Sequence, residues 1–279
     1  MVGLEDELGD VIAKARVGGG VTVEQLAAAT GFEPGEISEI EAYRLKPDGQ
    51  RLRKLAQTLS LDAARLETIA GEAWTPAPVD FPKLDVALAA IAVPYGGYGE
   101  NSYVVGCPRD RAAAIVDPGG AVEEIARALD ELKLTPELVL ITHAHADHIG
   151  GLKDIAVRWP GARLVNHQLE RDSAARGLKL RWEPAKDNIC LKMGSLNITP
   201  LATPGHTPGS VCYLVNGVCF VGDTLFAGSI GRPGQRDAYK QMLADIRLKV
   251  LSLPDETVLL PGHGPPTTVA EEKAHNPFF

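Results

Sequence analysis

The stretch Thr142-His143-Ala144-His145-Ala146-Asp147-His148-Ile149-Gly150-Gly151 places four metal-binding side chains within six residues. It follows the apolar run 138–141, which predicts a buried strand, so these side chains stand where a strand gives way to a loop. His143 and His145 are two residues apart and project to one side of extended backbone, where they can bind one ion. Asp147 and His148 are adjacent and must diverge, which suits a second ion beside the first. We therefore predict a metal site here.

Three more metal-binding side chains stand at predicted strand ends in the second half of the chain. His206 and His263 each follow a Pro-Gly pair, which favours a tight turn that fixes the next side chain in space. Asp223 closes another strand-like run. His167 and His275 lack this context, and we interpret them as surface or packing residues.

Length and composition describe an ordinary globular protein. Of 279 residues, 45% are apolar and 23% charged. The net charge of −8 argues against general affinity for nucleic acid or anionic membranes. No apolar run approaches the ~20 residues of a spanning helix, and the N-terminus lacks the pattern of a signal peptide. The four cysteines form no C-x-x-C pair, so free thiols and a cytoplasmic location are expected.

Residues 1–70 predict an all-helical domain. Apolar spacing indicates helices from Leu4 to Ile12, after an N-cap at Thr22, from Glu33 to Tyr43, over 52–59 and over 62–69. The pattern Thr-Val-Glu-Gln-Leu-Ala-x3-Gly-Phe-x3-Glu-Ile-Ser-x-Ile-Glu, at 22–41, resembles the helix-turn-helix of Cro/repressor-type DNA-binding domains. The segment 71–85 has three prolines between Trp74 and Pro82 and is predicted to be a linker.

Charge opposes DNA binding by this helical domain. Its second motif helix should enter the major groove, yet it carries four glutamates, and residues 1–73 have a net charge of −5. A module for dimerisation or partner contact is one interpretation. DNA binding is the other, based on one local basic patch: Arg44, Lys46, Arg51, Arg53 and Lys54.

Residues 86–279 alternate strands with helices. Strands are expected at 86–93, 101–105, 112–116, 138–141, 163–165, 198–201, 211–215 and 218–221, and helices at 121–132, 151–158, 167–176 and 238–251. Strands run early and late with helices between them. This order predicts two sheets sandwiched between helix layers.

His143-x-His145-x-Asp147-His148, followed in order by His206, Asp223 and His263, resembles the metallo-β-lactamase superfamily. The resemblance implies an α/β fold, the αββα sandwich, behind the small helix-turn-helix domain. It also implies that His143, His145 and His206 bind one metal, that Asp147, His148 and His263 bind a second, and that Asp223 bridges them. Asp117 matches a family position that hydrogen-bonds the site; a simple turn residue is the alternative.

The side chains agree with this chemistry. Imidazole and carboxylate ligands without thiolate suit two divalent ions, zinc first, with iron or manganese also possible. Two ions about 3.5–4 Å apart can share a water and lower its pKa towards ~7. The resulting metal-bound hydroxide would attack a carbonyl compound. Asp147 would orient it, acting as ligand and catalytic residue.

Gly222-Asp223-Thr224-Leu225-Phe226, the stretch 228–232 and the chain ending resemble the glyoxalase II branch. This implies hydrolysis of a small thioester such as S-lactoylglutathione, with Arg232 a candidate for holding a substrate carboxylate. The chain departs from larger glyoxalase II enzymes because it stops at Phe279, without their C-terminal helical extension. The alternatives are an iron-dependent persulfide dioxygenase, a lactonase, or a metal- or metabolite-sensing DNA-binding regulator. Repressor-like modules often pair, so a homodimer is expected.

Overall fold

The computed structural model describes residues 3–81, 84–95, 98–234 and 236–279. The helical region contains α1 (Leu8–Gly18), α2 (Val23–Thr30), α3 (Pro34–Glu41), α4 (Gly49–Leu59) and α5 (Ala63–Ala70). Thr22 caps α2 and Asp62 caps α5, each accepting a backbone N–H three residues later. The predicted helices are confirmed, although α1 begins at Leu8 rather than Leu4. Residues 3–7 instead form a segment that leads into the helix.

In the described part of the chain, twelve strands form two six-stranded sheets. The strand order of the first sheet is the order in the sequence: β1 (Ala87–Tyr95), β2 (Tyr98–Gly106), β3 (Ala112–Val116), β4 (Thr135–Leu140), β5 (Arg163–Asn166) and β6 (Arg181–Pro184). The second has the order β14 (Thr267–Thr268), β13 (Val258–Pro261), β10 (Val218–Gly222), β9 (Val211–Val215), β8 (Leu196–Ala202) and β7 (Leu191–Met193). A short hairpin, β11 (Leu225–Phe226) and β12 (Ser229–Ile230), follows β10.

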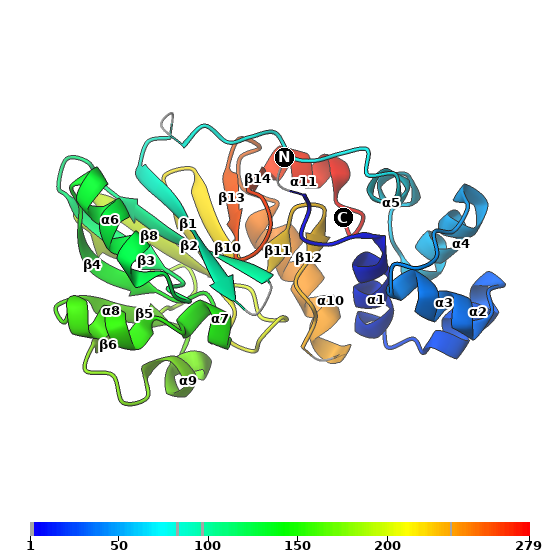
Figure 1. Cartoon of the computed structure of the whole chain (residues 1–279), viewed down its shortest axis with the longest axis horizontal. Helices are drawn as coiled ribbons and strands as arrows, with labels where there is room; N and C mark the ends of the chain where they lie inside the picture. Colours follow the sequence, from blue (N-terminus) through cyan, green and yellow to red (C-terminus); the bar gives the residue numbers. More distant parts are fainter. Residues whose placement is uncertain (1–2, 82–83, 96–97, 235) are drawn as a thin grey trace.

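Helices cover the outer face of each sheet (Figure 1). The two sheets share an inner core that includes Val105, Leu140 and Phe220. The outer face of the first sheet packs against α6 (Val122–Leu132), α8 (Leu152–Arg158) and α9 (Arg171–Ala175). The second packs against α10 (Arg236–Asp245), the π-helical turn η3 (Ile246–Val250) and α11 (Val269–His275). The predicted αββα sandwich is confirmed; the sequence patterns did not indicate α11.

The helical region is joined to the sandwich by one continuous apolar core. Ile12 and Leu66 belong to the same buried cluster as Met242 and Leu259 of the sandwich. In Figure 1 the helical region lies beside α10, α11 and the β11–β12 hairpin. Burial of apolar surface therefore stabilises the two parts together.

Polar and aromatic contacts reinforce this junction. The backbone N–H of Asp62 donates to the carbonyl of Pro277 at 2.8 Å. Trp74 stacks on His275 with ring centroids 4.6 Å apart, so His275 is a packing residue, as predicted. Residues 73–80 form neither helix nor strand. The domain boundaries 1–70, 71–85 and 86–279 stay predictions. Among the described residues, no helix combines the length and apolar character needed to cross a bilayer.

Gly18 tests the junction. A Cβ at this position would lie 2.5 Å from the ring of Tyr239 in α10. Gly18→Ala should lower the free energy of unfolding by about 1–3 kcal/mol through overpacking. Gly35→Ala is the matched control, because a Cβ at Gly35 meets no atom within 4 Å and alanine favours a helix. Urea unfolding of the three proteins measures the difference. Equal destabilisation by both variants would contradict the packing argument.

Glu272 carries a buried carboxyl in α11. It accepts hydrogen bonds from the Gly228 N–H at 3.1 Å, from Thr267 Oγ1 at 2.8 Å and from Asn276 Nδ2 at 2.8 Å. Burial raises the pKa of Glu272 to about 7, and these hydrogen bonds oppose that rise. The folded protein therefore holds this proton more tightly than the unfolded chain.

This raised pKa predicts a pH-dependent stability. The contribution of Glu272 is fully present below pH 4.5, the ordinary pKa, and is lost as pH rises through about 7. We expect Glu272→Gln to remove roughly 2–3 kcal/mol of the fall in unfolding free energy between pH 5 and pH 8. Denaturant unfolding at both pH values measures this. The exposed Glu131→Gln should keep the wild-type pH dependence, and an unchanged dependence in Glu272→Gln would refute the assignment.

Candidate metal centre

The predicted ligands meet at one edge of the two sheets. β3 and β4 run parallel, as do β10 and β13, so the carboxyl ends of each pair lie together. The loops after β4, β8, β10 and β13 bring the seven side chains into two groups, each with its ligand atoms within 4.8 Å of one another. The first group is His143, His145, His206 and Asp223; the second is Asp147, His148 and His263.

Three imidazole nitrogens converge in the first group. His145 Nδ1 lies 3.0 Å from His143 Nε2 and 2.9 Å from His206 Nε2. Asp223 Oδ2 lies 3.4 Å from His206 Nε2 and 3.9 Å from His143 Nε2. This donor set suits a divalent cation bound by nitrogen and oxygen.

The second group shares the same aspartate. Asp223 Oδ1 lies 3.4 Å from His148 Nε2 and 3.7 Å from His263 Nε2. Asp147 Oδ2 lies 3.4 Å from His263 Nε2. The two oxygens of Asp223 therefore face different groups. The cluster after β4 is also partly helical rather than a loop, because α7 (Ala146–Ile149) carries Asp147 and His148.

Hydrogen bonds fix which ring nitrogen faces the centre. His206 Nδ1 lies 2.9 Å from the carbonyl of Arg232, and His263 Nδ1 lies 2.8 Å from the carbonyl of Gly99. A carbonyl can only accept, so each Nδ1 carries the proton and donates it. The Nε2 atoms then present lone pairs to the centre, as metal ligands require.

Asp117 forms hydrogen bonds with both ends of the 142–148 stretch that follows β4. Its Oδ1 accepts the Thr142 N–H at 2.7 Å, and its Oδ2 accepts the Thr142 hydroxyl at 2.6 Å. Oδ2 also lies 3.1 Å from His148 Nδ1, so that ring too turns its Nε2 towards the centre. Asp117 adopts a positive φ of 46°, which aspartate tolerates better than most residues.

Two glycines allow this close approach. A Cβ at Gly222, whose φ is +48°, would lie 2.3 Å from Thr142 Oγ1. A Cβ at Gly262 would lie 2.5 Å from both Asp223 Oδ1 and His148 Cε1. Any side chain at either position would push the ligand loops apart.

The two groups fit cations on their own chemistry. His148 Nε2 and Asp223 Oδ1 are buried and have no hydrogen-bond partner among the described residues, a costly state that a cation relieves. Burial lowers the pKa of His143 and of His206, so both imidazoles are in the neutral, metal-binding form at pH 7. The residues present therefore fit two divalent ions.

Comparison with known proteins decides the family. Residues 95–263 match the metallo-beta-lactamase superfamily. The chain belongs to that superfamily. The probable metallo-hydrolase YqgX of Bacillus subtilis is 38% identical over 205 residues, which cover 67% of this chain and 95% of YqgX. Residues 12–66 separately match a helix-turn-helix family.

Two further relatives bear on the chemistry of the centre. The hydroxyacylglutathione hydrolase GloC of Haemophilus influenzae is 34% identical over 188 residues, covering 61% of this chain and 88% of GloC. The crystal structure of TTHA1623 in a di-iron-bound form is 31% identical with a TM-score of 0.53, and the match covers 68% of this chain and 100% of that chain.

The metallo-β-lactamase domain contains supporting residues that no sequence pattern indicated. Glu170 accepts the N–H of Ala144 and the N–H of Gly209, both at 3.1 Å, and so ties the loop of His143 to the loop of His206. Their separation in the sequence gave no indication of this contact.

Glu100 is a second residue that the patterns did not indicate. It is fully buried, and neither carboxyl oxygen has a hydrogen-bond partner among the described residues. Its Oε1 lies 3.9 Å from His148 Nδ1. Burial raises the pKa of Glu100 to about 10, so this side chain is a neutral acid at pH 7.

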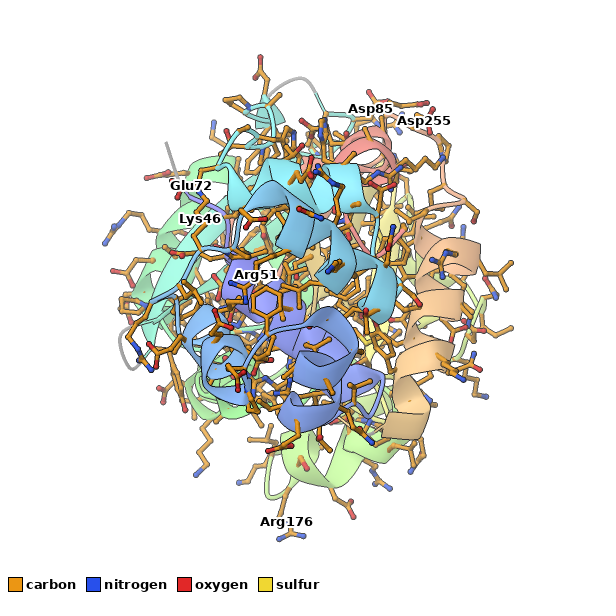
Figure 2. The ribbon with its side chains drawn as sticks, turned by 90° about the vertical axis from the view of Figure 1, so that its right-hand side faces the viewer. Lys46, Arg51, Glu72, Asp85, Arg176 and Asp255 are labelled. Atoms are coloured by element: carbon orange, nitrogen blue, oxygen red, sulfur yellow. The ribbon has the colours of Figure 1, made fainter. Side chains whose placement is uncertain are left out.

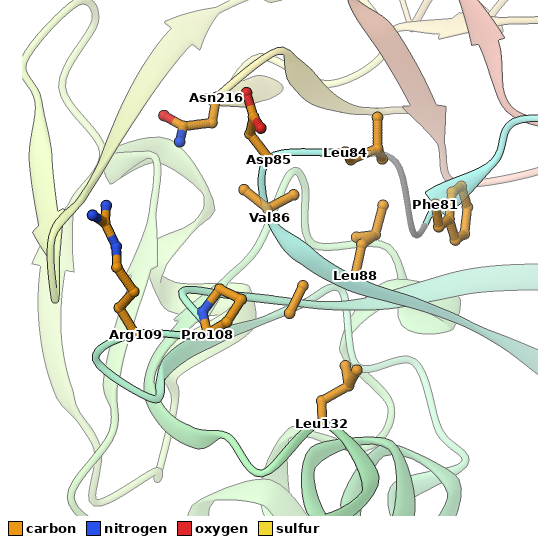
Figure 3. A pocket seen from close by; sticks show the side chains of 10 residues that line it. Phe81, Leu84, Asp85, Val86, Leu88, Pro108, Arg109, Leu132 and Asn216 are labelled. Atoms are coloured by element: carbon orange, nitrogen blue, oxygen red, sulfur yellow. The ribbon is translucent and has the colours of Figure 1, made fainter.

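Arg232 lies beside the centre through its backbone, whose carbonyl accepts from His206, while its side chain is exposed. The substrate contact predicted for its guanidinium stays a prediction. A cavity of about 760 Å³ lies elsewhere, lined by residues such as Val86, Arg109 and Asn216 (Figure 3). Val86 directly precedes β1, and Arg109 and Asn216 lie in the β2–β3 and β9–β10 turns, at the opposite ends of the strands from the ligand loops. This cavity is therefore not the metal centre.

The helix-turn-helix surface uses much of its positive charge internally. Arg44 pairs with Glu39 at 2.6 Å, Arg51 with Glu36 at 2.7 Å and Arg53 with Glu67 at 2.5 Å. Figure 2 shows Arg51 on the face of the helical region that looks away from the sandwich. The fold allows nucleic-acid binding, but phosphates would compete with these carboxylates for the arginines.

Asp117→Asn tests the support of the ligand loops. The amide keeps the shape and tolerates the positive φ, but its nitrogen cannot accept the hydrogen bonds that the carboxylate accepts. We expect metal affinity to fall about 10–100-fold, measured by competition with a chelator. Asp130→Asn, an exposed aspartate at the end of α6, is the control and should bind metal as the wild type does. Unchanged affinity in Asp117→Asn would contradict this role.

Proposed function

We propose that this metallo-β-lactamase superfamily protein is a thioester hydrolase that uses two divalent metal ions, with zinc favoured over iron or manganese. The observation that carries the proposal is the position of Asp223, whose two oxygens face the two complete ligand groups. Bound ions of this kind act as Lewis acids and supply a nucleophile from water at neutral pH. The 34% identity to GloC supports a hydroxyacyl thioester as the substrate class.

Asp147 has the clearest catalytic role among the chain's own residues. Its side chain is 23% exposed, more than Asp223 at 9%, so it can reach a water at the open side of the centre. The His263 imidazole holds the pKa of Asp147 below its ordinary value. The ionised carboxylate therefore orients the attacking water by accepting its hydrogen bond.

The proposed reaction consumes one water. The water oxygen forms a bond to the thioester carbonyl carbon, and the C–S bond breaks with its electron pair going to sulfur. One proton ends on the thiol, and the carboxylic acid loses the other at neutral pH. A thiolate leaves without a dedicated general acid, so the centre needs few groups beyond those described.

The second ligand group favours this proposal over a single-iron dioxygenase. A single-metal centre at His143, His206 and Asp223 would leave His148, His263 and Asp147 without a role. Two of these three are buried, and buried polar groups are costly unless they are paired. Two metals per chain in protein purified without added metal would support the hydrolase; one iron per chain would favour the dioxygenase.

Asp223→Asn should abolish both metal binding and hydrolysis. The amide removes the charge that faces both groups, so we expect metal content to fall below one ion per chain. The rate on S-lactoylglutathione should fall by about 10³-fold or more, which corresponds to several kcal/mol of charge stabilisation. Elemental analysis and thiol release measure the two effects. Exposed Asp154→Asn is the control; full metal content and rate in Asp223→Asn would overturn the proposal.

A further inference from the structure

The segment of residues 3–7, which precedes α1, lies against the loop that carries His263. A Cβ added to Gly264 would lie 2.9 Å from Cβ of Glu5 and 3.1 Å from its backbone nitrogen. Gly264 directly follows a ligand of the second group. Part of the helical region therefore lies at the rim of the metal centre.

Buried contacts hold this segment in place. Asp6, next to Glu5, pairs with Lys14 of α1, and both side chains are buried. The Lys14 ammonium donates to the carbonyl of Ile230 in β12 at 2.8 Å and lies 4.8 Å from the ring centre of Phe226. Removing one partner of a buried ion pair is strongly destabilising, so the pairing keeps the segment in register with the β11–β12 hairpin.

The same hairpin borders the metal centre. Phe226 of β11 makes an edge contact with the His263 ring, with centroids 6.0 Å apart. Lys14 therefore connects α1 to a residue that touches a ligand. This places the Glu5 segment and the ligand loop on one continuous surface.

Glu5 places a carboxyl group at this rim. Its side chain is partly buried, and no described residue makes a hydrogen bond or ion pair with its carboxylate. Burial raises the pKa of Glu5, and the charge of the nearby His263 opposes that rise. Bound divalent ions favour the ionised form of a nearby carboxylate. When the centre holds metal, the ionised carboxylate would therefore be able to act on the charge of a substrate.

We propose that Glu5 is a specificity-determining residue that selects thioesters whose thiol carrier presents a cation, and disfavours carriers that present a carboxylate. This inference rests on the proposed thioester hydrolysis and names the substrate class more closely. A fixed charge at the rim of a partly desolvated site discriminates between partners by its sign.

Two thioesters of similar size and opposite charge test the proposal. S-lactoylthiocholine carries a quaternary ammonium, and the S-lactoyl thioester of 3-mercaptopropionate carries a carboxylate at a similar distance from sulfur. We expect wild type to prefer the cationic thioester. Glu5→Gln should shift the ratio of kcat/KM for the two substrates towards the anionic one by about tenfold, and Glu5→Lys by more. The shift should appear mainly in KM, with metal content unchanged.

The control is Glu24→Gln, which makes the same change in net charge at an exposed position on α2. It should change the substrate ratio by less than about twofold, since exposed distant charges are screened. If wild type hydrolyses these thioesters but the ratio of kcat/KM is the same in wild type, Glu5→Gln and Glu5→Lys, the role of Glu5 is overturned and the proposed function is not. Failure of wild type to hydrolyse any of these thioesters or S-lactoylglutathione would overturn the proposed function, and this inference with it.

Discussion

The position of Asp223 between two groups of imidazoles is the constraint on which the rest of the site depends. A carboxylate with one oxygen facing each group must sit where the ends of both sheets meet. Its neighbours then have to approach within a few ångströms, and the absence of a side chain at Gly222 and Gly262 makes this possible. The sandwich supplies the frame for this arrangement, because parallel pairing within each sheet brings strand ends to one edge.

The surrounding hydrogen bonds serve the same constraint. Asp117 and the carbonyls of Gly99 and Arg232 each accept a hydrogen bond from the Nδ1–H of a histidine, so that Nε2 faces inward. These acceptors come from three different parts of the chain. The metal-binding form of the centre is therefore set by groups that bind no metal, which is common for histidine ligands.

Much of this could be predicted from local patterns. Strand periodicity followed by histidine or aspartate located all seven candidate ligands, because each stands within a few residues of a recognisable strand end. Glu170 and Glu100 could not be found in that way. Their roles depend on contacts across the fold, such as the bond from Glu170 to Gly209, and no short-range pattern encodes them. The same reason explains the start of α1: Leu4 has helical spacing, but Asp6 is held by Lys14 and the segment turns towards the sandwich.

The charge distribution of the helix-turn-helix region differs from that of a typical DNA-binding module. In a DNA-binding module the surface of the second motif helix must be free and basic, whereas α3 presents glutamates that pair with the nearby arginines. Meanwhile α1 and α5 pack against the sandwich, where Ile12 and Leu66 enter its core cluster. A surface buried on that scale fixes the helices relative to the metal centre rather than leaving them free to move. The shared core therefore gives this region a structural role beside the metallo-β-lactamase domain, whatever else its exposed surface binds.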